Sequence, residues 1–75
     1  MITPEQCRAA RALLRMSQDD LAAKTKLSAV TIRKFENQTD SLREATINLI
    51  ELTLEAGGVE FIDKNGGGPG VRLRG

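Results

Sequence analysis

The chain has 75 residues, 40% of them hydrophobic, and a net charge of +1. This length suffices for one small domain whose core lies near the lower limit for an independent monomer. With one cysteine, Cys7, and no histidine, the chain cannot close an internal disulfide and offers no metal-ligand cluster. Extra stability is therefore expected from association with another chain.

Enzymes, membrane proteins and secreted proteins are not expected from this sequence. His and Tyr are absent, Cys7 has no candidate base, and no cofactor motif occurs, so neither catalysis nor a cofactor is predicted. No run of 18 apolar residues and no signal-peptide pattern occur, which predicts a cytoplasmic protein. Cys7 is expected to be a half-buried helix residue rather than a redox sensor, because no second cysteine can resolve it.

Charge is spread unevenly along the chain. Residues 8–38 hold seven Lys or Arg against three Asp or Glu, whereas residues 39–63 hold one against six. The residues from Lys64 onward carry three basic side chains and no acidic one. This division predicts a basic surface that can meet an anionic partner and an acidic surface turned away from it.

Four helix starts are predicted from capping patterns. Each has a Thr or Ser cap, and three of the four have Gln, Asp or Glu three residues later, as in a capping box. The predicted caps are Thr3, Ser17, Ser28 and Ser41. Gly57-Gly58 is expected to end the fourth helix. The predicted helices cover residues 4–15, 18–25, 29–36 and 42–56.

The C-terminal segment is predicted to form a β-hairpin. Apolar and polar residues alternate in 59–63 and again in 71–74, and the glycine-rich segment 64–70 connects them. A phosphate-binding loop is the alternative for these glycines. It is disfavoured because no Gly-Lys-Ser/Thr ending and no following helix are present. The chain thus divides into a helical domain, 1–58, and a hairpin, 59–75.

Helices 18–25 and 29–36 are joined by three residues, as in a helix-turn-helix. On a helical wheel, Ile32, Phe35 and Glu36 share one side of the second of these helices. The opposite side carries Val30, Arg33, Lys34 and Asn37. Basic and amide side chains can bind phosphates and base edges, and a small apolar one can contact a thymine methyl. A solvated surface helix is the alternative.

The segments 15-RMSQDDLAAK-24 and 31-TIRKFEN-37 resemble the lambda-repressor/Cro type of helix-turn-helix regulator, also called XRE-like. The resemblance extends from about Arg11 to Phe61, and the segment 57–75 is similar to the tail of some small bacterial members. It implies a mainly α fold of four or five helices, here with a C-terminal hairpin. It also implies binding of double-stranded operator DNA, mostly as a dimer.

The resemblance assigns roles to individual residues, for which capping or structural pairing is the alternative. Base contacts are implied for Gln18, Ala29, Val30, Arg33 and Lys34. Phosphate contacts are implied for Arg11, Ser17, Ser28, Thr31, Asn37 and Gln38. An ion pair between Arg11 and Glu36 is implied as well. The chain departs from the family where Lys26 occupies the usual turn glycine, and where Ala29 and Val30 replace glutamines of phage members.

A homodimer is predicted because the fourth helix has two apolar sides. Ile47, Ile50 and Leu54 form one stripe, and Leu49 and Leu52 belong to another that needs cover. The hairpin or a second subunit can supply that cover. The predicted interface comprises Leu49, Leu52, Ala56, Val59, Phe61, Val71 and Leu73. Two recognition helices about 34 Å apart would then read an inverted repeat.

The predicted function is sequence-specific DNA binding that regulates transcription, as a repressor or an activator. An antitoxin or mobile-element control protein is a close alternative. A protein-interaction module that uses the same fold without DNA is the alternative from another class. The operator sequence does not follow from the residues, because the family's base-reading glutamines are missing.

Overall fold

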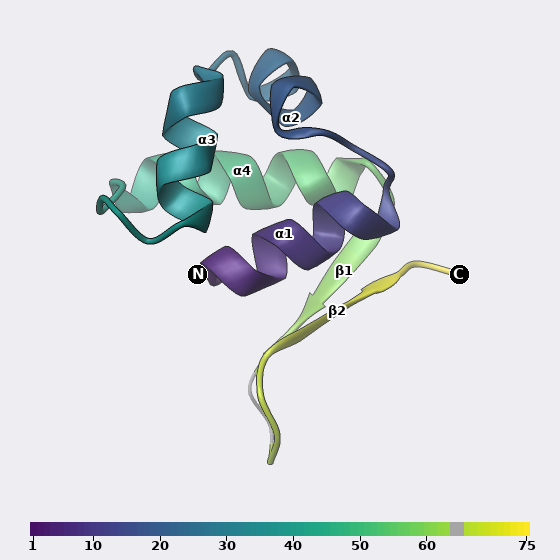
Figure 1. The fold of residues 1–75 in the computed structure, drawn as a ribbon. Helices are drawn as coiled ribbons and strands as arrows, with labels where there is room; N and C mark the ends of the chain where they lie inside the picture. The colour runs from purple at the N-terminus through teal and green to yellow at the C-terminus, as the bar shows by residue number, and fades with distance from the viewer. Residues whose placement is uncertain (64–65) are drawn as a thin grey trace.

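The computed structural model describes residues 1–63 and 66–75. The elements are α1 (Pro4–Leu13), α2 (Gln18–Thr25), α3 (Ala29–Glu36), α4 (Glu44–Ala56), β1 (Val59–Ile62) and β2 (Gly70–Leu73). The helices α2 and α3 pack together at one end, α4 runs beneath them, and the hairpin lies beside α1 (Figure 1). The predicted mainly α fold with a C-terminal hairpin is confirmed. No helix among the described residues is long and apolar enough to cross a membrane.

The first three helices begin at the predicted caps. Thr3 Oγ1 accepts a hydrogen bond from the Gln6 amide at 3.0 Å, and Gln6 Oε1 accepts one from the Thr3 amide at 2.9 Å. Ser17 and Asp20 form the same reciprocal pair, at 2.9 Å in both directions. These bonds satisfy amide groups that have no partner inside a helix. The predicted bounds of α2 and α3 are confirmed.

Three helices end with a non-glycine residue in the left-handed conformation. Arg15, Lys26 and Gln38 have φ angles of 54°, 61° and 58°. The amide of the following residue bonds back to a carbonyl five positions earlier, for example Leu27 to Ala22 at 3.1 Å. This geometry satisfies orphan carbonyls and reverses the chain, but it is a position where glycine is preferred. Lys26 therefore adopts the left-handed conformation that the resemblance leads one to expect of a glycine at this turn.

Two predicted helix bounds are wrong. Helix α1 ends at Leu13 rather than residue 15, because Arg15 turns into the left-handed conformation. Helix α4 begins at Glu44 rather than residue 42, and Ser41 does not cap it. The Ser41 amide instead donates to Asp40 Oδ1 at 2.9 Å. Leu42 packs against the core in the extended segment before the helix, which delays the helix start.

The core is formed by residues from every element except β2. Leu21, Ile32, Ile50, Leu54 and Val59 are completely buried. The stripe predicted for α4 is confirmed, because Ile47 is buried as well. The other stripe of α4 is uncovered in the monomer, since Leu49 and Leu52 are 40% and 64% exposed.

The hairpin packs on α1 and does not cover the second stripe of α4. Its strands are antiparallel, with Val59 opposite Leu73 and Phe61 opposite Val71. The side-chain amide of Gln6, on α1, donates to the carbonyl oxygens of Ile62 at 3.3 Å and Gly70 at 2.8 Å. These bonds anchor both strands to the helical domain.

The hairpin's position corrects the predicted interface. Val59 is completely buried inside its own chain, so it has no surface to offer a partner. Phe61 and Val71 are half-buried against the same core, whereas Leu73 is 52% exposed. Strand β1 begins at Val59 as predicted but ends one residue early, at Ile62, and β2 is shifted by one residue, to Gly70–Leu73. Part of the predicted turn, residues 64–65, lies outside the described residues.

Replacing Lys26 by glycine is expected to stabilise the domain by about 0.5–1 kcal/mol, because glycine tolerates the left-handed conformation of this exposed position. The measurement is urea unfolding followed by circular dichroism. Lys24→Gly is the matched control, since Lys24 is an exposed helical residue two positions earlier. That change is expected to cost about 1 kcal/mol. A loss of stability in Lys26→Gly would contradict the role assigned to this turn.

Candidate nucleic-acid interface

A helix-turn-helix is formed by α2, the turn at Lys26 and Leu27, and α3. The left-handed Lys26 reverses the chain, while Leu27 packs partly into the core. Thr25 is buried, and its hydroxyl donates to the Leu21 carbonyl at 2.9 Å. Ser28 then caps α3 by accepting a hydrogen bond from the Thr31 amide at 3.0 Å. The angle between the two helices is thus set by backbone conformation, capping and packing together.

The two sides of α3 have the predicted composition. Ile32, Phe35 and Glu36 are buried against the rest of the domain. The exposed side carries Val30, Arg33, Lys34 and Asn37, which we call the α3 outer face. Ala29 and Thr31 flank it and are half-buried. The α3 outer face therefore combines two cations, an amide and a small apolar side chain, which is a composition suited to phosphates and base edges.

The N-terminus of α2 carries two further predicted contact residues, Ser17 and Gln18. Ser17 is exposed, but its hydroxyl already accepts the Asp20 amide as a cap. Gln18 is half-buried, and its side-chain nitrogen donates to Glu36 Oε1 at 3.2 Å. This bond joins the start of α2 to the last turn of α3. The sequence patterns did not reveal it, because a pairing across 18 positions has no local signature.

The carboxylate of Glu36 is the centre of a buried polar cluster. Arg11 Nε donates to Oε2 at 2.6 Å and Arg11 Nη2 donates to Oε1 at 2.6 Å, which is a bidentate pairing. Cys7 Sγ lies 3.3 Å from Oε2 and donates to it. The Glu36 side chain has no exposed surface, and that of Arg11 is 17% exposed. The predicted Arg11–Glu36 ion pair is thus present, and it is buried.

The cluster shifts the acid–base behaviour of its members. Burial alone would raise the pKa of Glu36, but hydrogen bonds from Arg11, Gln18 and Cys7 outweigh it and hold this pKa below its ordinary value of 4.5. Burial raises the pKa of the Cys7 thiol far above its ordinary range, and the nearby Glu36 carboxylate raises it further. Cys7 is therefore a neutral thiol that serves as a hydrogen-bond donor, and it is fully rather than half-buried.

Several predicted phosphate contacts are engaged in bonds within the chain. Arg11 uses Nε and Nη2 for Glu36, and Nη1 donates to the Met16 carbonyl at 3.0 Å. Gln38 donates to Glu5 Oε2 at 2.8 Å, which places a carboxylate where a phosphate would be repelled. The hydroxyls of Ser28 and Thr31 lie 2.8 Å apart. To bind a phosphate, each of these side chains must use a donor that remains free or give up one of these bonds.

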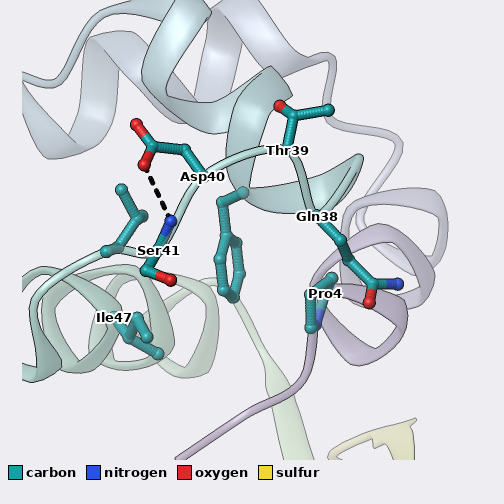
Figure 2. Close-up of a pocket in the computed structure, with 8 residues that line it drawn as sticks. Pro4, Gln38, Thr39, Asp40, Ser41 and Ile47 are labelled. Carbon is teal, nitrogen blue, oxygen red and sulfur yellow. Dashed lines mark hydrogen bonds between the residues drawn. The ribbon is translucent and has the colours of Figure 1, made fainter.

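A hollow of about 580 Å³ lies between the end of α3, the start of α1 and α4. Figure 2 shows Gln38, Thr39, Asp40 and Ser41 in the α3–α4 loop at its rim, with Pro4 and Ile47 beside them. None of its lining residues is basic, and Asp40 contributes a carboxylate. The hollow is therefore unsuited to phosphate, although Gln38, a predicted phosphate contact, lies at its rim.

The fold and the α3 outer face define a helix-turn-helix domain, and the comparison with protein families agrees. The family model described as Helix-turn-helix matches residues 8–60. The chain therefore belongs to this Cro/C1-type, XRE-like family of regulators, whose helix-turn-helix domain binds double-stranded DNA. The family is regulatory rather than catalytic. No curated protein matches the chain.

Because Arg11 and Glu36 form a buried ion pair, we expect acid to change the free energy of unfolding in opposite directions in the wild type and in Arg11→Ala. In the wild type the pKa of Glu36 is lowered, so its stabilisation is full above pH 4.5 and is lost as the pH falls through the folded-state pKa. Without Arg11, burial dominates and the pKa of Glu36 rises above 4.5. The variant then regains stability on acidification, because it can protonate the buried carboxyl.

Arg11→Ala is expected to cost about 3 kcal/mol at pH 7, and this deficit is expected to shrink by about 1 kcal/mol or more at pH 4. Urea unfolding at both pH values measures it. Arg8→Ala is the control, because Arg8 is an exposed arginine of the same helix, and it should cost less than about 0.5 kcal/mol. An equal loss of stability at pH 4 and pH 7 would show that removing Arg11 does not raise the folded-state pKa of Glu36.

Proposed function

We propose that the chain is a sequence-specific transcriptional regulator that inserts α3 into the major groove of an inverted-repeat operator as a homodimer. The observation that carries this proposal is the α3 outer face. Its four side chains are exposed although Ile32, Phe35 and Glu36 on the other side of the same helix are buried. A helix of this size fits the major groove, where each base pair presents a distinct pattern of donors, acceptors and methyl groups.

The proposed base contacts come from α3 and from the start of α2. Arg33 and Lys34 carry donors suited to guanine O6 and N7, and Val30 is a small apolar group suited to a thymine methyl. Ala29 borders this face and is half-buried. Gln18 reaches the same groove from α2 and can pair with adenine.

The proposed phosphate contacts surround these base contacts. Ser17, Ser28 and Thr31 have polar side chains at the N-termini of α2 and α3, where backbone amides also point outward, and Asn37 lies at the C-terminus of α3. Arg11 and Gln38 have the fewest donors left, since both are bonded within the chain.

The hairpin contributes less to DNA binding than the helices in this proposal. Arg72 pairs with Glu60, and Arg74 bonds to the Glu55 carbonyl. An additional contact from Lys64, suggested by the sequence, concerns a residue outside the described part of the chain.

The proposed dimer contact is the outer stripe of α4, which comprises Ala45, Leu49, Leu52 and Ala56. Its two leucines remain 40% and 64% exposed because the hairpin packs elsewhere. An apolar patch on a small domain favours burial by a second copy around a two-fold axis. Leu73, 52% exposed on the hairpin, is a second candidate contact.

Selection of bound fragments from random or genomic DNA by the purified protein tests the function. The expected result is enrichment of an inverted repeat whose half-sites lie about one helical turn apart. Affinity for the selected duplex, measured by fluorescence anisotropy, should fall steeply as salt increases. Enrichment of no sequence by a folded protein would instead favour a protein-interaction module.

Lys34→Ala is expected to weaken binding to the selected duplex and, if Lys34 meets a phosphate, to lower the salt slope by about 1. If it meets a base, specificity at one position should relax instead. The control is Arg8→Ala, which removes one positive charge from an exposed residue of α1, outside both the α3 outer face and the outer stripe of α4. An equal loss of affinity in both variants would indicate only a general charge effect.

Leu49→Asp is expected to convert the dimer into a monomer, because it places a charge in the outer stripe of α4. Multi-angle light scattering at tens of micromolar measures the mass. Leu13→Asp is the matched control, since Leu13 is also 40% exposed but lies on α1. Truncation after Gly58 is not a suitable test, because it removes the completely buried Val59. A monomeric wild type would contradict the proposed dimer.

A further inference from the structure

We propose that Glu36 is a positioning residue for DNA reading, because its buried carboxylate holds the side-chain amide of Gln18 in one orientation at the DNA-facing surface. The inference rests on the proposed function, in which Gln18 contacts the operator. Glu36 itself has no exposed side-chain surface, so it can act on DNA only through a neighbour.

Four donors surround the carboxylate. Oε2 accepts from Arg11 Nε at 2.6 Å and from Cys7 Sγ at 3.3 Å. Oε1 accepts from Arg11 Nη2 at 2.6 Å and from Gln18 Nε2 at 3.2 Å. An ionised carboxylate offers roughly four acceptor sites, so each oxygen has two donors. Among the described residues, no buried side-chain nitrogen or oxygen lacks a partner.

This saturation makes the orientation of Glu36 rigid. The bidentate pairing with Arg11 fixes the plane of the carboxylate, and Arg11 is itself held by the Met16 carbonyl at 3.0 Å. Cys7, completely buried on α1, occupies the remaining site on Oε2. The site on Oε1 is therefore directed toward the start of α2, where Gln18 lies.

The carboxylate also decides which way the Gln18 amide points. An ionised carboxylate only accepts hydrogen bonds, so the amide nitrogen of Gln18 must face Glu36 and its carbonyl oxygen must turn away. The reversed amide would place two oxygens in contact. A defined orientation matters because glutamine pairs with adenine through its oxygen and its nitrogen together. Glu36 thus prepares Gln18 for a directional contact before DNA arrives.

The charge of Glu36 requires a double-mutant cycle rather than a single variant. Glu36→Gln removes a negative charge near the DNA and would strengthen binding generally, whatever Gln18 does. That effect is common to both backgrounds and cancels in the cycle. The part that remains measures the coupling between Glu36 and Gln18.

The experiment measures affinity for the selected duplex by fluorescence anisotropy, at one salt concentration, for the wild type, Gln18→Ala, Glu36→Gln and the double variant. We expect Gln18→Ala to weaken binding about 5-fold or more. We expect the effect of Glu36→Gln to be about 5-fold more adverse when Gln18 is present than in the Gln18→Ala background. An identical effect in both backgrounds would overturn the inference.

A measurement on the free wild-type protein separates failure of this inference from failure of the proposed function, and it does not depend on the variant folding. In NMR spectra, the two side-chain amide protons of Gln18 should be displaced from those of the exposed Asn48 and should exchange slowly with water. Averaged, rapidly exchanging Gln18 signals would overturn the inference even if the protein binds its operator. If wild-type protein enriches no DNA sequence, the proposed function fails, and the DNA-reading role assigned to Glu36 fails with it.

Discussion

The buried pairing between Arg11 and Glu36 is the interaction on which the rest of the structure depends. It joins α1 to α3 at 2.6 Å through two parallel hydrogen bonds, and Arg11 also holds the loop before α2 through Met16. A buried carboxylate without these donors would be strongly unfavourable. The pair does not replace the hydrophobic core, which supplies the driving force, but it requires three elements to meet in one arrangement.

Helix ends provide the second constraint. Each of the three short helices is followed by a left-handed residue that is not glycine. One of these residues, Lys26, lies in the turn between α2 and α3. Each costs some backbone strain, which is offset because the same geometry satisfies carbonyls. After Arg15 and Lys26 the next residues, Met16 and Leu27, also pack against the core. The helix-turn-helix therefore keeps its shape with Lys26, rather than glycine, in the left-handed conformation. The exposed Lys26 also adds a positive charge to the turn between α2 and α3.

The packing of α4 and the hairpin explains why the proposed DNA surface and the proposed dimer surface lie on different elements. One stripe of α4 closes the core, and the hairpin is held to α1 by Gln6. Leu49 and Leu52 are thereby left on the outside. The basic residues lie mainly before residue 39 and the acidic ones mainly after it, so the proposed dimer surface is separated in sequence and charge from the proposed DNA surface.

The sequence by itself determined most of the secondary structure, the family and the two faces of α3, because caps, periodicity and turn chemistry act over three or four neighbouring positions. It failed at Ser41, where packing of Leu42 delays α4, and at Val59, which looked like an interface residue and is core. Only the tertiary structure decided that Glu36 binds Gln18 and Cys7, and that Gln6 anchors the hairpin. Those contacts join residues 18 to 64 positions apart, and their partners are selected by how whole elements pack.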